Sequence, residues 1–85
     1  EVIENNLGFL KVYPNPASNY INVLTNSKTI EAIKVFDILG KVVFETNKVN
    51  KTSLMLNVRD LNKGAYLIKV FLEGESETYS RFIKN

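Results

Sequence analysis

Apolar and polar side chains alternate with a period of two along most of the chain. Ile33 and Val35 share one side of the segment 30–37, and Lys34 and Phe36 share the other. A strand places successive side chains on opposite faces, so this alternation predicts strands, and no segment keeps the 3.6-residue period of a helix over three turns. We predict seven strands, at residues 10–13, 20–24, 30–37, 41–46, 54–58, 64–72 and 76–83.

Clusters of turn-forming residues separate these strands. The segment 14–19 holds two prolines, which fix φ and lack the N–H donor that a central strand needs. Asp37 and Gly40 suit the first and fourth positions of a type I turn. Turns are also predicted at 60–64 and 73–75, and the polar stretch 47–51 is predicted to be a loop. Seven short strands at this spacing predict an all-β, antiparallel β-sandwich.

Three polar side chains at the predicted corners have structural explanations. Tyr66 follows Gly64 at the start of a late strand, where Greek-key sandwiches often carry a tyrosine whose hydroxyl bonds to backbone a few residues upstream. Asp37 and Asp60 each precede a turn, so we expect their carboxylates to accept hydrogen bonds from nearby N–H groups. None of these three roles requires a ligand site.

The composition argues against an enzyme. The 85 residues include no cysteine and no histidine, which removes the thiolate nucleophile, the commonest general base and the commonest metal ligand. The glycines at positions 8, 40, 64 and 74 are isolated, so no phosphate-cradling loop is present. We therefore expect no catalytic residue, no metal and no cofactor.

Charge and hydropathy exclude two further classes. The net charge of +2 comes from interspersed lysines, arginines and acids, whereas nucleic-acid binding needs cations clustered on one face. The longest apolar run is residues 65–68, far short of the roughly 20 residues of a membrane-spanning helix. Residues 1–8 show no turn chemistry and little periodicity, so we expect them to be the end of a linker and residues 9–85 to be the domain. The chain begins at Glu1 and not at methionine, so we expect it to be a piece of a longer protein.

Four segments carry a resemblance to a known family. The segment 13–23 is YPNPASNYINV, and the segment 35–43 is VFDILGKVV. The segment 61–70 is LNKGAYLIKV, and the chain ends with SRFIKN at 80–85. These four blocks, in this order and spacing, resemble the type A C-terminal sorting domain of the type IX secretion system. The resemblance covers the chain from about residue 10 onward.

The resemblance implies a fold, a secretion route for the whole protein and the partners along that route. It implies a seven-stranded immunoglobulin-like sandwich at the end of a secreted protein, with a passenger domain upstream in the same chain. The precursor would cross the periplasm, be recognised by the outer-membrane translocon and its shuttle components, and reach the cell surface or the medium. A sortase-like surface peptidase would usually remove the domain. The ending Ile83-Lys84-Asn85 departs from the lysine- or arginine-terminated tail of many members.

The residues expected to carry sorting lie in the four blocks and in the tail. They are Pro14, Asn15, Pro16, Asp37, Gly40, Lys41, Gly64, Tyr66, Arg81, Phe82, Ile83, Lys84 and Asn85. Alternation persists almost to Asn85, so we hypothesise that the last strand lies at a sheet edge and adds to a sheet of the receptor. Tyr79, Arg81 and Ile83 would then face one way, and Phe82 and Lys84 the other.

The alternative is a non-catalytic fibronectin-like or carbohydrate-binding accessory module, because a sandwich alone does not separate the two functions. Such a module needs an exposed aromatic platform and can stand anywhere in its parent protein. A sorting domain must end the polypeptide.

Overall fold

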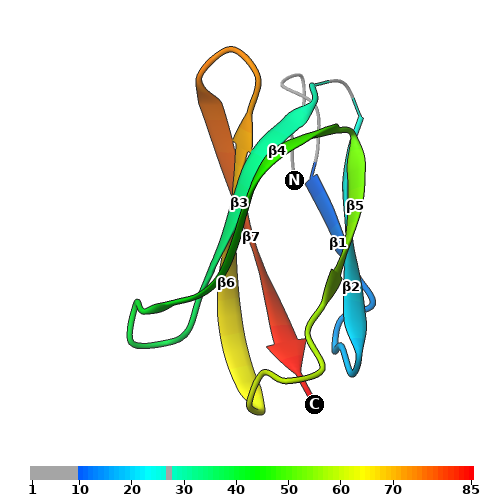
Figure 1. The fold of residues 1–85 in the computed structure, drawn as a ribbon. Coiled ribbons are helices and arrows are strands. Elements are labelled where there is room, and N and C mark those ends of the chain that lie inside the picture. Colours follow the sequence, from blue (N-terminus) through cyan, green and yellow to red (C-terminus); the bar gives the residue numbers. More distant parts are fainter. Residues whose placement is uncertain (1–9, 27) are drawn as a thin grey trace, which may run out of the picture.

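The computed structural model describes residues 10–26 and 28–85, so the predicted linker at residues 1–8 lies outside the described part of the chain. The described residues form strands and no helix (Figure 1). The strands are β1 (Leu10–Tyr13), β2 (Tyr20–Thr25), β3 (Ile30–Phe36), β4 (Val42–Lys51), β5 (Ser53–Asn57), β6 (Gly64–Leu72) and β7 (Ser76–Lys84).

The strands form two antiparallel sheets that face each other. The smaller sheet has the order β1-β2-β5, and the larger has the order β4-β3-β6-β7. The chain crosses between the sheets after β2, after β4 and after β5, whereas β1 and β2, β3 and β4, and β6 and β7 pair within one sheet (Figure 1). This arrangement confirms the predicted all-β sandwich, and it places β7 at one edge of the larger sheet.

The core lies between the sheets and is filled by alternate residues of the strands. From β6, Tyr66, Ile68, Val70 and Leu72 are all buried, as the sequence period predicts. The other main contributors are Ile21, Val23, Ile33, Val35, Leu56 and Phe82. Burying one such side chain contributes about 1.5–3 kcal/mol, and without a disulfide this burial is the main source of stability.

The prediction of a loop at residues 47–51 is wrong, because β4 continues to Lys51. Asn47 pairs with Ala32 and Lys51 pairs with Ile30, with a register shift between these two pairs. Lys48 and Asn50 have φ angles of 56° and 58° and absorb the irregularity. β4 is an edge strand, whose polar residues face solvent, so its sequence resembles that of a loop.

Strict alternation along the predicted strand 41–46 would place Val42 and Phe44 on one face, and this expectation is also wrong. Val35 pairs with Phe44 and Phe36 with Val42, so Val43 is an extra residue in β4. A β-bulge of this kind interrupts the alternation. As a result Val42 is exposed, whereas Val43 and Phe44 both pack against the core.

The predicted turn between β3 and β4 is confirmed. The N–H of Gly40 donates to the carbonyl of Asp37 at 3.0 Å, and Gly40 has a φ of 85°, a left-handed conformation that glycine adopts without strain. The carboxylate Oδ1 of Asp37 accepts hydrogen bonds from the N–H groups of Leu39 and Lys41, both at 2.9 Å. This cap fixes the hairpin tip.

The corner before β6 is held by Tyr66. Its hydroxyl donates to the carbonyl oxygen of Asn62 at 2.5 Å, which confirms the expected tyrosine corner. The expected cap by Asp60 is not formed within the described part of the chain. Instead the side-chain oxygen of Asn57 accepts the N–H of Arg59 at 2.9 Å, so the cap lies three residues earlier than the sequence suggested.

A clasp joins the β2–β3 connection to the β6–β7 turn. One carboxylate oxygen of Glu73 accepts the hydroxyl of Thr29 at 2.5 Å and the Thr29 N–H at 2.8 Å, and the Glu73 N–H donates to the Thr29 carbonyl at 3.0 Å. The hydroxyl and then the N–H of Thr29 lower the pKa of Glu73 below its usual 4.5.

This lowered pKa predicts a pH-dependent contribution to stability. Because the folded pKa lies below the unfolded one, the contribution is fully present above about pH 4.5 and is lost as the pH falls through the folded pKa. We expect the Tm difference between the wild-type chain and Glu73→Gln to shrink steadily below that pH. Thermal unfolding followed by circular dichroism between pH 3 and pH 7 measures it. Glu75→Gln, in the same turn, is the matched control and should show no such trend.

Candidate functional site

The four signature segments meet at one end of the sandwich. Gly64 pairs with Lys84 and Ala65 pairs with Ile83, which brings the start of β6 beside the end of β7. The β3–β4 turn joins them because β3 pairs with β6 as far as Leu67. The segment 14–17 lies against the end of β7 through a parallel bridge between Ala17 and Lys84. β1 begins toward the other end of the sandwich, away from the C-terminus of the chain (Figure 1).

The end of β7 alternates as predicted. Phe82 is fully buried, and its ring stacks on Tyr66 with centroids 5.4 Å apart and an interplanar angle of 18°. Lys84 is also buried, and its Nζ donates to the backbone oxygen of Asn85 at 3.0 Å. Arg81 and Ile83 are exposed on the outer face of the sheet. Phe82 and Lys84 therefore support the fold, whereas Arg81 and Ile83 are available for contact.

The segment after β1 covers part of the edge of β7. The side-chain oxygen of Asn15 accepts the Ile83 N–H at 2.9 Å, and its Nδ2 donates to the carbonyl of Arg81 at 3.3 Å. The Ala17 N–H donates to the Ile83 carbonyl at 2.7 Å, and the Ala17 carbonyl accepts the Asn85 N–H at 2.8 Å. The last residues of β7 thus have hydrogen-bond partners on both sides.

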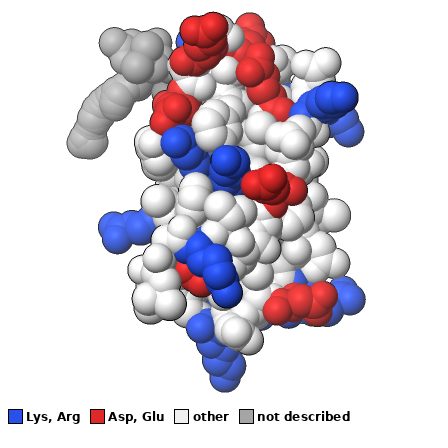
Figure 2. All heavy atoms as spheres, turned by 60° about the vertical axis from the view of Figure 1, so that its left-hand side comes forward, with Lys and Arg blue, Asp and Glu red and all other residues white. Residues whose placement is uncertain are grey.

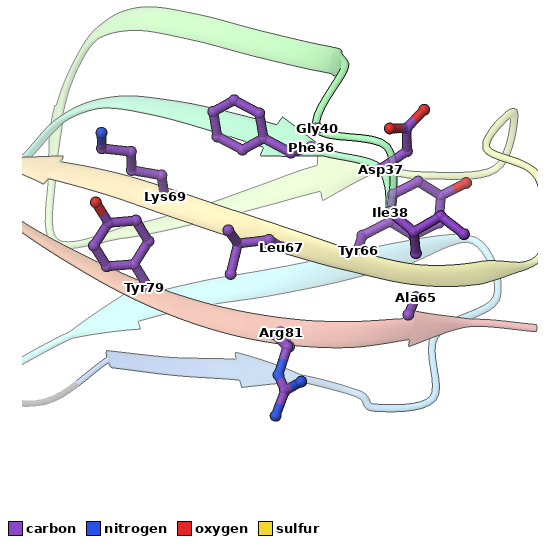
Figure 3. A pocket seen from close by; sticks show the side chains of 10 residues that line it. All are labelled: Phe36, Asp37, Ile38, Gly40, Ala65, Tyr66, Leu67, Lys69, Tyr79 and Arg81. Carbon is purple, nitrogen blue, oxygen red and sulfur yellow. The ribbon is translucent and has the colours of Figure 1, made fainter.

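An open groove of about 650 Å³ runs over the outer face of the larger sheet at this end (Figure 3). Leu67 lies in its middle, Lys69 and Tyr79 stand together toward one end, and Ile38 lies beside Tyr66 at the other (Figure 3). The lining is mostly apolar. Its full set is Phe36, Asp37, Ile38, Gly40, Ala65, Tyr66, Leu67, Lys69, Tyr79 and Arg81. A second depression of about 320 Å³ shares Ala65 and Arg81 with it and extends to Asn15 and Ile83.

A polar cluster borders the groove on β6 and β7. The Nζ of Lys69 lies 3.2 Å from a carboxylate oxygen of Glu77, and the Tyr79 hydroxyl donates to the same oxygen at 2.6 Å. The ammonium also lies over the rings of Phe71 and Tyr79, 5.1 Å and 5.5 Å from their centroids. The hydrogen bond from Tyr79 and then the one from Lys69 lower the pKa of Glu77, and the same carboxylate raises the pKa of Lys69. The ion pair of Lys69 and Glu77 thus orients the Tyr79 side chain.

Charges are mixed on this side of the molecule (Figure 2). Acidic side chains gather at the top of the view, over the β6–β7 turn, and lysines and arginines are spread among acids and uncharged surface below it. The face carries no continuous basic field, which agrees with the net charge of +2. Contact here would depend on local pairs and apolar surface.

Exposed apolar side chains concentrate near the groove. Among the described residues, nine large hydrophobic side chains are exposed, and six of them belong to the β3–β4 hairpin, β6 or β7. Ile38 and Leu39, at the hairpin tip, are 80% and 87% exposed. The six are Ile38, Leu39, Val42, Leu67, Tyr79 and Ile83. An apolar patch rimmed by polar groups is typical of a protein-binding surface.

The structure brings together most of the residues that the sequence singled out. Asn15, Arg81 and Ile83 are in contact, and Tyr66 contacts Phe82. Asp37, Gly40, Tyr66 and Arg81 share the groove. The remaining members of the set are the exposed Pro14, Pro16, Lys41, Gly64 and Asn85 and the buried Lys84.

Sequence reasoning missed Ala17 and Leu67. Ala17 is fully buried and supplies two of the four hydrogen bonds to the edge of β7. The sequence gives little indication of this role for Ala17, because a small residue after two prolines is typical of a loop. Leu67 is an apolar residue on the exposed face of β6, where alternation predicts a polar one. This departure from alternation could have indicated a contact residue.

The described residues hold no group of three His, Cys, Asp or Glu side chains able to bind a metal ion. No helix among them is long and apolar enough to span a membrane. The site offers apolar surface, a strand edge and a few oriented polar groups, which is the chemistry of protein recognition.

Comparisons with known proteins identify the family. The model of the secretion system C-terminal sorting domain matches residues 11–85, nearly the whole chain. The chain belongs to this family. It is therefore a sorting domain of type IX secretion, which implies a passenger and delivery to the cell surface or beyond. The match favours sorting over the accessory-module alternative.

Two individual proteins are similar to this sorting domain. The ulvan lyase NLR42 of Nonlabens ulvanivorans is 28% identical over 75 residues, a match that covers 87% of this chain and 14% of the lyase. The chain thus spans a small part of that relative's length. The crystal structure of CopC from Methylosinus trichosporium OB3b superimposes with a TM-score of 0.53 at 17% identity, covering 91% of this chain and 90% of CopC. This second likeness shows the fold alone.

Proposed function

We propose that the domain carries an upstream passenger protein through the periplasm to the outer-membrane translocon of the type IX system. The translocon recognises the end of the sandwich where the four signature segments meet. A sortase-like surface peptidase then cleaves in the segment before Leu10. The domain itself performs no reaction.

One observation carries this proposal. Segments up to 68 residues apart in the sequence converge on one end of the fold, around an apolar groove and the edge strand β7. The core alone does not require this convergence, because several of these residues are exposed. An exposed apolar groove beside a sheet edge supports recognition by a protein.

Within this end, we assign contact to the exposed members of the predicted set. Arg81 and Ile83 offer a guanidinium and an apolar side chain on the outer face of β7, next to the groove. Pro14, Asn15 and Pro16 flank them, and the hairpin tip at 37–41 forms the far rim. Gly64, Tyr66, Phe82 and Lys84 hold this surface in shape. The row of backbone groups on β7 would let a receptor strand add to the sheet.

The proposal predicts that two exposed side chains of β7 are needed for export. The test fuses the 85-residue chain to a secreted reporter in a bacterium that has a type IX system. The double variant Arg81→Glu/Ile83→Thr should lower surface delivery at least about tenfold, the effect expected when contacts worth about 1.4 kcal/mol are lost. Thermal unfolding of the purified variant checks that the fold persists.

The matched control makes the same chemical changes on the smaller sheet. Lys11→Glu/Met55→Thr reverses one exposed charge and removes one exposed apolar side chain, and neither residue lines the groove. Its export should stay within about twofold of the wild-type level. Two outcomes would contradict recognition at this end. The β7 variant could be exported at the wild-type level, or the two variants could lose export equally.

A further inference from the structure

The segment 14–17, which we name the latch, imitates a strand beside β7. Its four hydrogen bonds meet the Arg81 carbonyl, both backbone groups of Ile83 and the Asn85 N–H. The Asn15 side-chain amide serves as a peptide group, since it offers one donor and one acceptor. The bridge between Ala17 and Lys84 shows that the latch runs parallel to β7.

The latch covers half of the edge. Residues of an edge strand alternately direct both backbone groups toward the neighbouring strand and away from it. Ile83 points outward to the latch, so Tyr79 and Glu77, four and six residues earlier, point outward too. The latch ends its contacts at Arg81, and the outward backbone groups of Glu77 and Tyr79 have no hydrogen-bonded neighbour strand in the described part of the chain.

Few buried contacts hold the latch against the rest of the domain. Pro14, Asn15 and Pro16 are exposed, and two of the four hydrogen bonds come from the exposed side chain of Asn15. Ala17 alone among these residues is buried. Its methyl group buries little area, and an exposed hydrogen bond exchanges readily with water. Displacement of the latch therefore leaves the main core in place.

We propose that the latch occupies the position of a partner's strand and must leave before an extended segment of a protein partner pairs with β7 over residues 81–85. The groups uncovered by its departure are alternating N–H and C=O groups at strand spacing, which another backbone complements. The folded domain thus hides the edge of its terminal strand until it meets its receptor. This inference rests on the proposed function, because it supposes that β7 is recognised.

Hydrogen exchange of single amides tests the latch in the isolated chain. In Asn15→Ala the Ile83 amide loses its acceptor, so its exchange should accelerate at least about tenfold relative to the wild type. Asn19→Ala is the matched control, because Asn19 lies in the same loop and its side chain makes no hydrogen bond within the described residues. The amides of Thr78 and Val70 should keep their rates in both variants. An unchanged rate at Ile83 would overturn the latch.

A disulfide lock tests whether the latch must open. The wild-type chain has no cysteine, so Ala17→Cys/Lys84→Cys places a single pair at bridge partners. Bridge partners lie about 5 Å apart, within the range that a disulfide spans. We expect surface delivery of this variant to rise at least about tenfold when reductant is added to the medium, because the lock is released.

The wild-type fusion under the same two conditions controls for effects of the reductant on the cells. Export of the double-cysteine variant that does not respond to reductant would overturn the inference. Failure of the wild-type chain to deliver the reporter would instead refute the proposed function, and the exchange rates would still decide whether the latch exists.

Discussion

Replacing Phe82 with alanine is expected to lower the free energy of unfolding by about 3–5 kcal/mol, the usual cost of removing a fully buried phenylalanine. Phe82 is completely buried and is the largest of the fully buried side chains. Its ring also stacks on Tyr66, and such contacts contribute about 0.5–1.5 kcal/mol beyond area burial. A domain of this size has a total stability of only about 4–13 kcal/mol, so a large part would be lost.

Urea unfolding monitored by circular dichroism measures this effect. The neighbouring substitution Ile83→Thr is the control, because it keeps a β-branched side chain at a position that is 46% exposed. It should change stability by less than about 1 kcal/mol. Phe82→Leu retains most of the side-chain volume, so its loss of stability should lie between those of Phe82→Ala and Ile83→Thr. Equal midpoints for Phe82→Ala and Ile83→Thr would show that the tail does not belong to the core.

This prediction affects how a truncated tail is interpreted. Deleting residues 81–85 removes Phe82 together with the partners of Asn15 and Ala17. Lost export after such a deletion would follow from unfolding as readily as from the loss of a recognition sequence. Substitutions at the exposed Arg81 and Ile83 separate the two causes, because they leave the buried face of β7 intact.

The sequence predicted strands well wherever one face is buried. β6 has the predicted bounds because its alternating side chains must enter the core, and a shift of one residue would expose all of them. The same reasoning failed for β4, whose polar end at 47–51 places only the half-buried Val49 against the core, too little to impose a pattern. Nor does a period of two reveal a bulge such as the one at Val43, because the extra residue changes the phase locally.

The arrangement of the site was less predictable than the fold. The resemblance marked Pro14, Asn15 and Arg81 as a set but gave no reason for their association. The reason is a pair of hydrogen bonds across 66 and 68 residues of sequence, for which there is no local signal. The exposed Ile38 and Leu39 are a second example, because apolar residues in a turn would ordinarily be assigned to the core.

Replacing Tyr66 with phenylalanine is expected to lower the free energy of unfolding by about 1–2 kcal/mol, because the hydroxyl loses its bond to the Asn62 carbonyl and that carbonyl loses its protein partner. The ring remains stacked on Phe82, so the change isolates the corner from the core. The corner aligns the start of β6, where Gly64 pairs with Lys84. The amide exchange of Lys84 should therefore accelerate together with the loss of stability.

Tyr79→Phe supplies the matched control. Its hydroxyl also donates a short hydrogen bond, to Glu77, but the side chain is 51% exposed and water replaces the lost partner. We expect a change of less than about 0.5 kcal/mol in this variant, measured by urea unfolding under the same conditions. If both variants lose the same free energy of unfolding, the hydrogen bond of the Tyr66 hydroxyl contributes no more than an exposed one. If Tyr66→Phe alone is destabilised and Lys84 exchanges faster, the corner is the link between the β5–β6 connection and the end of β7.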